Sequence, residues 1–82
     1  MMRMDRMTLG QRIRDRRQQL GLKQADIARA VGVQPQSMYR IETDQVSNPG
    51  VELVARIAEE LRCSLDFLVK GEGPPETAGS NA

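Results

Sequence analysis

Residues 24–42, QADIARAVGVQPQSMYRIE, constrain the fold of this 82-residue chain more than any other stretch. The spacing of their apolar side chains predicts two short amphipathic helices, over about residues 24–31 and 35–42, joined at Gly32. Glycine adopts the positive φ of such a turn without strain, and Ala28 is small enough for a close helix crossing. Further apolar residues hold the two helices at a fixed angle: Ile27, Val31, Val33, Met38 and Ile41. One polar side of the later helix is therefore expected to face outward.

A helix is also expected before this pair, from about Thr8 to Gln19. Thr8 and Gln11 have the spacing of a capping box, in which two side chains satisfy backbone N–H groups at a helix start. Gly21 follows the last turn and is a typical helix end.

Two more helices are expected after residue 42. One covers about residues 51–61, where apolar residues recur at helical spacing, and a shorter one follows Ser64, a good N-cap. No segment alternates apolar and polar residues over a strand length, and the chain has one tyrosine and one phenylalanine. The sequence therefore predicts an all-α domain of five helices over residues 8–70. Residues 1–7 are expected to form an N-terminal extension, and residues 71–82, rich in proline and glycine, are expected to form a disordered tail.

The composition argues against catalysis, metal binding and export. The chain has no histidine and one cysteine, Cys63, which is expected to be a small core residue. Glu59 and Glu60 are adjacent, and neighbouring helical residues do not face each other, so a catalytic dyad is not expected. No apolar run suits a membrane span or a signal peptide, which predicts a cytoplasmic protein that is not an enzyme and has no cofactor or metal.

Charge is unevenly distributed, although the net charge is only +1. Residues 1–40 hold nine Lys/Arg and three Asp/Glu, whereas residues 41–82 hold three Lys/Arg and eight Asp/Glu. One interpretation is attraction of a polyanion by the basic half, and the other is an ordinary solvated surface. Arg12, Arg14 and Arg16 are expected to lie on a solvated face of the first helix.

Two helices joined by a short turn with glycine form a helix-turn-helix. The stretch 24–42, with LGQRIRDRRQQLGLK before it and NPGVELVARIAEELRCSLDFLVKGE after it, resembles the phage-repressor-like family of Cro/repressor, or XRE-type, regulators. The resemblance extends from about Thr8 to Glu72. It implies a compact five-helix, lambda-repressor-like DNA-binding domain whose third helix enters the major groove.

The resemblance also implies roles for individual residues. Gln24 matches a position that contacts a backbone phosphate, and Arg17 and Glu42 match a structural ion pair. Four residues match outward positions of the recognition helix: Gln34, Gln36, Ser37 and Arg40. Among them, Gln36 is the candidate for adenine, and Arg40 for guanine or a phosphate.

Further matches lie beside the recognition helix. Tyr39 is expected to reach a phosphate or sugar, and Ser47 and Asn48 to meet the DNA strand through backbone N–H groups. Departures from the family pattern include Asp44, near the place of a usual glycine, and Arg62, where a helix-ending glycine is common. Asp44 tolerates the left-handed conformation better than most residues, so the turn is expected to form.

The function implied is that of a sequence-specific transcriptional regulator of the repressor type. It would bind double-stranded DNA as a homodimer on a near-palindromic operator, without a small-molecule ligand. The expected dimer surface involves Leu65, Phe67 and Leu68. The alternative is an antitoxin or protein-interaction module on the same scaffold, which a co-purifying partner would favour.

Overall fold

The computed structural model describes residues 7–46 and 48–71, and within these ranges it contains five α-helices and no strand. The helices are α1 (Leu9–Gln19), α2 (Gln24–Val31), α3 (Pro35–Glu42), α4 (Val51–Glu60) and α5 (Leu65–Lys70). The predicted all-α class and the order of the helices are confirmed. The predictions for residues 1–6, for Ser47 and for residues 72–82 lie outside the described residues.

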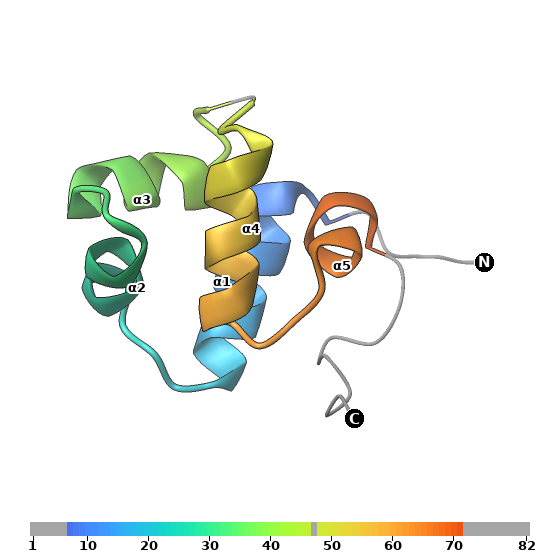
Figure 1. Ribbon diagram of the computed structural model, residues 1–82, viewed down its shortest axis with the longest axis horizontal. Coiled ribbons are helices and arrows are strands. Elements are labelled where there is room, and N and C mark those ends of the chain that lie inside the picture. Colours follow the sequence, from blue (N-terminus) through green and yellow to red (C-terminus); the bar gives the residue numbers. More distant parts are fainter. Residues whose placement is uncertain (1–6, 47, 72–82) are drawn as a thin grey trace.

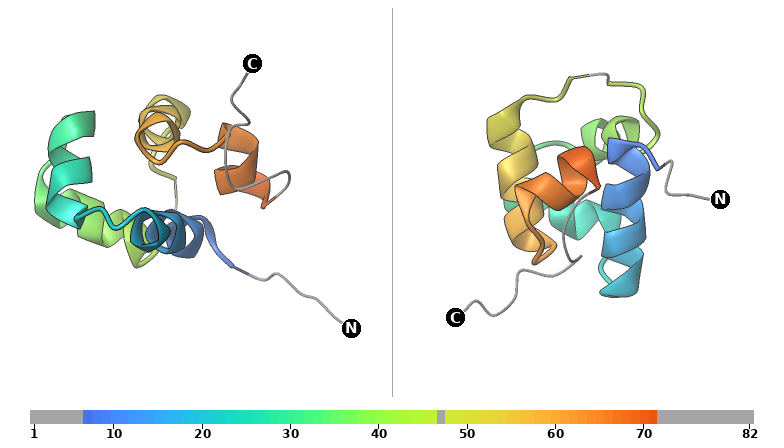
Figure 2. Two further views of the ribbon diagram at one scale, coloured as in Figure 1. Left: turned by 90° about the horizontal axis from the view of Figure 1, so that it is seen from below. Right: turned by 90° about the vertical axis from the view of Figure 1, so that its right-hand side faces the viewer.

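The helices surround one core. α2 packs against α3 and α4, α1 packs against α3 and α5, and α4 packs against α5. Figures 1 and 2 show α2 and α5 on opposite sides of the molecule, with α1 and α4 between them. The core side chains come from all five helices and from the turn after α4: Ile13, Ile27, Ala28, Val31, Met38, Ile41, Val54, Ile57, Ala58, Leu61, Cys63 and Leu68. In the described part of the chain, no helix is long and apolar enough to cross a bilayer.

Two arginines of α1 are buried, which corrects the expectation that Arg12 and Arg16 are solvated. The Nε of Arg12 donates to the Leu68 carbonyl oxygen at 2.8 Å, and its Nη2 donates to that of Val69 at 3.0 Å. The Nε of Arg16 donates to the Leu61 carbonyl oxygen at 2.9 Å. These acceptors lie at the C-terminal ends of α4 and α5, where helix carbonyl groups lack partners and the helix dipole favours positive charge. The two arginines therefore join α1 to the C-terminal ends of α4 and α5.

The start of α1 is held by residues from two parts of the chain. The predicted capping box of Thr8 and Gln11 is present. In addition, the Asp44 carboxylate accepts from the Thr8 hydroxyl at 2.5 Å and from the Gly10 backbone N–H at 3.1 Å. The helix dipole also favours a carboxylate at a helix N-terminus. Asp44, which follows the C-terminus of α3, therefore stabilises the start of α1.

Two helices end at non-glycine residues in the left-handed conformation. Asp44, with φ of 62°, follows α3, and Arg62, with φ of 55°, follows α4. After α3, the Gln45 N–H donates to the Arg40 carbonyl and the Asp44 N–H to that of Ile41. This is the hydrogen-bond pattern of a Schellman motif, so the expected turn forms without glycine.

We expect Arg62→Gly to raise the free energy of unfolding by about 0.5 kcal/mol, because relief of the left-handed strain exceeds the entropy cost of glycine. For a domain of this size that is a rise in Tm of about 2–4 °C. Asp44→Gly is the matched comparison, since it removes similar strain but also the contacts to Thr8 and Gly10. Its Tm should fall. A rise in both variants would contradict the role assigned to Asp44.

Candidate nucleic-acid interface

The outward side of α3 carries a group of polar side chains. Gln36, Ser37 and Arg40 are exposed, as is Gln34 immediately before the helix. Tyr39 is 53% exposed. On the opposite side of the same helix, Met38 and Ile41 are buried in the core. Among the described residues, the Arg40 guanidinium has no hydrogen bond or ion pair, so its charge is available to a ligand.

The α2–α3 turn sets this outward orientation. Gly32 has φ of 81°, and the Val33 N–H donates to the Ala28 carbonyl oxygen at 2.9 Å. Ala28 is fully buried. A larger side chain there would force the helices apart, since interiors are packed without spare volume. The small residue and the glycine thus hold α3 across the end of α2 (Figure 1).

A buried ionic group links the three N-terminal helices. The Glu42 carboxylate, on α3, accepts from the Arg17 Nε at 2.7 Å and from the Arg17 Nη2 at 3.0 Å. The same carboxylate accepts from the Gln24 side-chain amide at 3.0 Å. Glu42 is 3% exposed as a residue. Gln24, expected from the resemblance to contact phosphate, is therefore oriented by Glu42, and its amide keeps a second hydrogen for another acceptor.

The N-terminal ends of α2, α3 and α4 have no side-chain cap, whereas α1 and α5 are capped by Thr8 and Ser64. No side chain accepts from their first N–H groups, although the Asp26 N–H of α2 donates to the Lys23 carbonyl oxygen at 3.0 Å. Pro35, at the start of α3, has no N–H. Uncapped helix starts bind anions through these N–H groups and the helix dipole. The Lys23 side chain adds a positive charge beside α2. Asn48, in the loop before α4, is exposed, while Ser47 lies outside the described residues.

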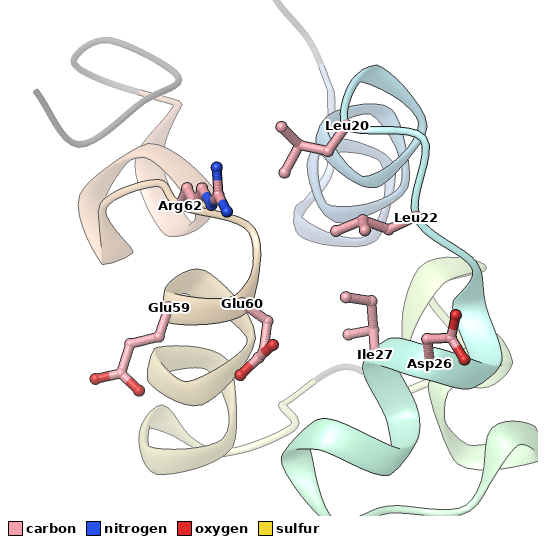
Figure 3. A pocket seen from close by; sticks show the side chains of 7 residues that line it. All are labelled: Leu20, Leu22, Asp26, Ile27, Glu59, Glu60 and Arg62. Atoms are coloured by element: carbon pink, nitrogen blue, oxygen red, sulfur yellow. The ribbon is translucent and has the colours of Figure 1, made fainter. Parts of the chain in front are cut away.

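One recess of the surface has the wrong charge for a polyanion. It lies between the C-terminal parts of α1 and α4 and the start of α2, and Figure 1 shows these ends away from α3. Figure 3 shows Leu22, Ile27 and Glu60 pointing into it. Its lining holds three carboxylates and one guanidinium: Asp26, Glu59, Glu60 and Arg62. DNA would be repelled from this side. The exposed side of α3 carries the Arg40 guanidinium and no exposed carboxylate, so it is the candidate interface.

The described residues outside this face give no indication of a metal site or a reactive thiol. Among the described residues, no group of three His, Cys, Asp or Glu side chains lies close enough to hold a metal ion. Cys63 is buried, and desolvation raises the pKa of its thiol, an effect that the nearby Arg16 guanidinium opposes. A thiol with a raised pKa is a poor nucleophile at neutral pH.

Comparison with known proteins agrees with the geometry. A family model described as helix-turn-helix matches residues 13–68. Repressor protein C2 of Salmonella phage P22 is 35% identical over 69 residues, covering 84% of this chain and 32% of that protein. The chain belongs to the phage-repressor-like helix-turn-helix family. It spans about a third of the length of this relative.

Solved structures of relatives within the helix-turn-helix family have the same arrangement of helices. The P22 c2 repressor in complex with a synthetic operator has a TM-score of 0.73 and 33% identity, covering 80% of this chain and 98% of that one. The DNA-binding domain of the same repressor in solution has a TM-score of 0.74 and 34% identity, covering 83% and 88%. SinR of Bacillus subtilis in complex with DNA has a TM-score of 0.70 and 26% identity, covering 74% and 97%. The predicted lambda-repressor-like fold is thereby confirmed.

Proposed function

We propose that this helix-turn-helix protein is a sequence-specific DNA-binding transcriptional repressor that places α3 in the major groove. The observation that carries the proposal is the outward side of α3, where Gln36, Ser37 and Arg40 are exposed together while Met38 and Ile41 anchor the other side. An α-helix with its side chains is about 10–12 Å across, and the major groove is about 12 Å wide. The P22 c2 repressor in complex with a synthetic operator and SinR in complex with DNA support DNA binding by this fold.

The chemistry of the exposed side chains assigns their roles. The Gln36 amide suits the N6 and N7 edge of adenine, and the Arg40 guanidinium suits the O6 and N7 edge of guanine. Ser37 contacts a base or the backbone, and Gln34 contacts the edge of the same groove. Tyr39 extends from the side of α3 toward a sugar or phosphate.

Phosphate contacts would hold α3 in register along the groove. Gln24 presents its remaining amide hydrogen at the uncapped start of α2. The loop before α4 would add backbone N–H contacts to the DNA strand at Asn48 and, as the resemblance implies, at Ser47, which lies outside the described residues.

We further propose that the protein acts as a homodimer, because one α3 contacts only a few base pairs and two-fold operators supply two half-sites about 34 Å apart. The expected interface needs one correction. Leu68 is fully buried in the core of its own chain and is not available to a partner. Leu65 and Phe67 are half-buried, and the apolar side chain exposed on α5 is Val69, at 49%.

We expect Arg40→Ala to weaken binding to the preferred sequence by about 1–3 kcal/mol and to relax the preference at one base pair. The preferred sequence would first be selected from a random DNA pool with the purified protein, and each variant would then be selected in the same way. Arg29→Ala, which removes an exposed arginine of α2, is the control and should leave the preference unchanged. An equal loss on all sequences would show that Arg40 contacts only phosphate.

The same selection tests the function as a whole. Failure of the unaltered protein to enrich any sequence would contradict repression through operator binding. A stable protein partner recovered in that case would favour the interaction module instead.

A further inference from the structure

A second recess lies between α1, α2 and α3, and it is lined by side chains outside the proposed base-contacting set. Its volume is about 380 Å³. Polar residues from all three helices line it: Arg14, Arg17, Gln18, Gln24, Tyr39 and Glu42. The Arg17–Glu42 ion pair forms its inner side, so the recess adjoins the network that orients Gln24.

The recess carries a net positive charge. Glu42 is its one carboxylate, and Arg17 neutralises it through two hydrogen bonds. Arg14 is exposed and has no ion pair among the described residues, so its guanidinium remains uncompensated. The recess in Figure 3 has the opposite character, with three carboxylates against one guanidinium.

Several hydrogen-bond donors around the recess have no acceptor within the described part of the chain. The Arg14 guanidinium, the Gln18 amide and the Tyr39 hydroxyl make no side-chain hydrogen bond there. Gln24 uses one amide hydrogen on Glu42 and keeps the other. Guanidinium and amide donors around one positive charge match a phosphodiester, a monoanion with two accepting oxygens.

We propose that Arg14 and Gln18 of α1 contact the DNA-backbone phosphate that this recess would hold beside Gln24. The proposal rests on the proposed DNA binding. It extends the proposed DNA interface from α2 and α3 to α1. The spacing of arginines along α1 does not by itself tell that Arg14 is exposed while Arg12 and Arg16 are buried. A phosphate held here would lie beside the Arg17–Glu42 pair, and would thus fix the angle at which α3 enters the groove.

The experiment compares Arg14→Ala and Gln18→Ala with Arg62→Gly. The last variant also removes one positive charge, but from the acidic recess far from α3. Affinity for the selected operator and for a random duplex would be measured over a range of salt concentrations. Arg14→Ala should lower the affinity for the operator and for the random duplex about five- to tenfold. It should also reduce the magnitude of the slope of log K against log salt by about one. Gln18→Ala should weaken both about threefold with an unchanged slope, since it removes a hydrogen bond and no charge.

Ethylation interference locates the contact. At one phosphate, ethylation should block DNA binding by the unaltered protein but not by Arg14→Ala. Ethylation of every other contacted phosphate should block binding by both proteins. Titration with inorganic phosphate, followed through the side-chain amide signals of Gln18 and Gln24, separates a free anion from the DNA backbone. Shifts with inorganic phosphate but none with the duplex would overturn the proposal.

Two further outcomes separate this proposal from the proposed function. Equal losses in Arg14→Ala and Arg62→Gly, with the same ethylation pattern, would show only a general charge effect. The phosphate site would then be overturned while operator binding stands. If the unaltered protein selects no DNA sequence and binds no duplex, both proposals are overturned together.

Discussion

Gly10→Ala should destabilise the domain by about 3 kcal/mol or more, although alanine in a helix is normally about 1 kcal/mol more favourable than glycine. A Cβ at this position would lie 2.4 Å from the Ile41 carbonyl oxygen, 2.6 Å from the Glu42 carbonyl oxygen and 2.7 Å from Asp44 Oδ1. The first two atoms belong to the backbone of α3, so relief requires α1 and α3 to separate. The loss is a large part of the total stability of a small domain.

Thermal and urea unfolding followed by circular dichroism would measure the change. Arg14→Ala is the matched control, because it introduces alanine into the same helix at an exposed position with no partner among the described residues. It should leave the Tm nearly unchanged. A Gly10→Ala protein as stable as this control would disprove the close approach of α1 to the end of α3.

Glu42→Ala should lower the free energy of unfolding by about 3–5 kcal/mol. The substitution leaves the Arg17 guanidinium, whose side chain is 13% exposed, without its counter-charge, and it removes the acceptor of the Gln24 amide. Because the same carboxylate joins α1, α2 and α3, any protein that remains folded should also bind DNA more weakly.

Two comparisons distinguish a buried pair from a general charge effect. Asp26→Ala breaks the exposed Arg29–Asp26 pair at 3.4 Å and should cost no more than about 0.5 kcal/mol. The double variant Arg17→Met, Glu42→Leu replaces both charges with apolar side chains and should recover much of the stability. If Glu42→Ala lowers the free energy of unfolding no more than Asp26→Ala does, the Arg17–Glu42 pair contributes little to the stability of the fold.

The sequence predicted the parts of the structure that depend on near neighbours. The capping box of Thr8 and Gln11 and the N-cap at Ser64 join residues three positions apart. The left-handed turns at Gly21 and Gly32 follow from the conformational freedom of glycine. Asp44 was expected to tolerate that conformation, and it does so with φ of 62°.

The exposed side of α3, which forms the candidate interface, was also predictable from residues close in sequence. Helical spacing alone separates the exposed Gln36 and Arg40 from the buried Met38 and Ile41, because the two sides of a helix alternate with a period of 3.6 residues. Spacing does not tell which of several basic residues on one helix is buried. Arg12 and Arg16 lie four residues apart on one side of α1, and Arg14 and Gln18 lie four apart on another.

By itself, then, the sequence determined the five helices, their turns and the polar side of α3, since hydrogen bonds and apolar spacing within a few residues decide all of these. Only the tertiary structure decided which residue types are needed where helices distant in sequence come into contact. Arg12 and Arg16 are buried because carbonyl groups 45 to 57 residues away need donors. Gly10 is required because the end of α3 leaves no room for a Cβ, and Leu68 is in the core because α1 and α4 both reach α5. Contacts between distant segments exist only after the chain has folded, so no local pattern records them.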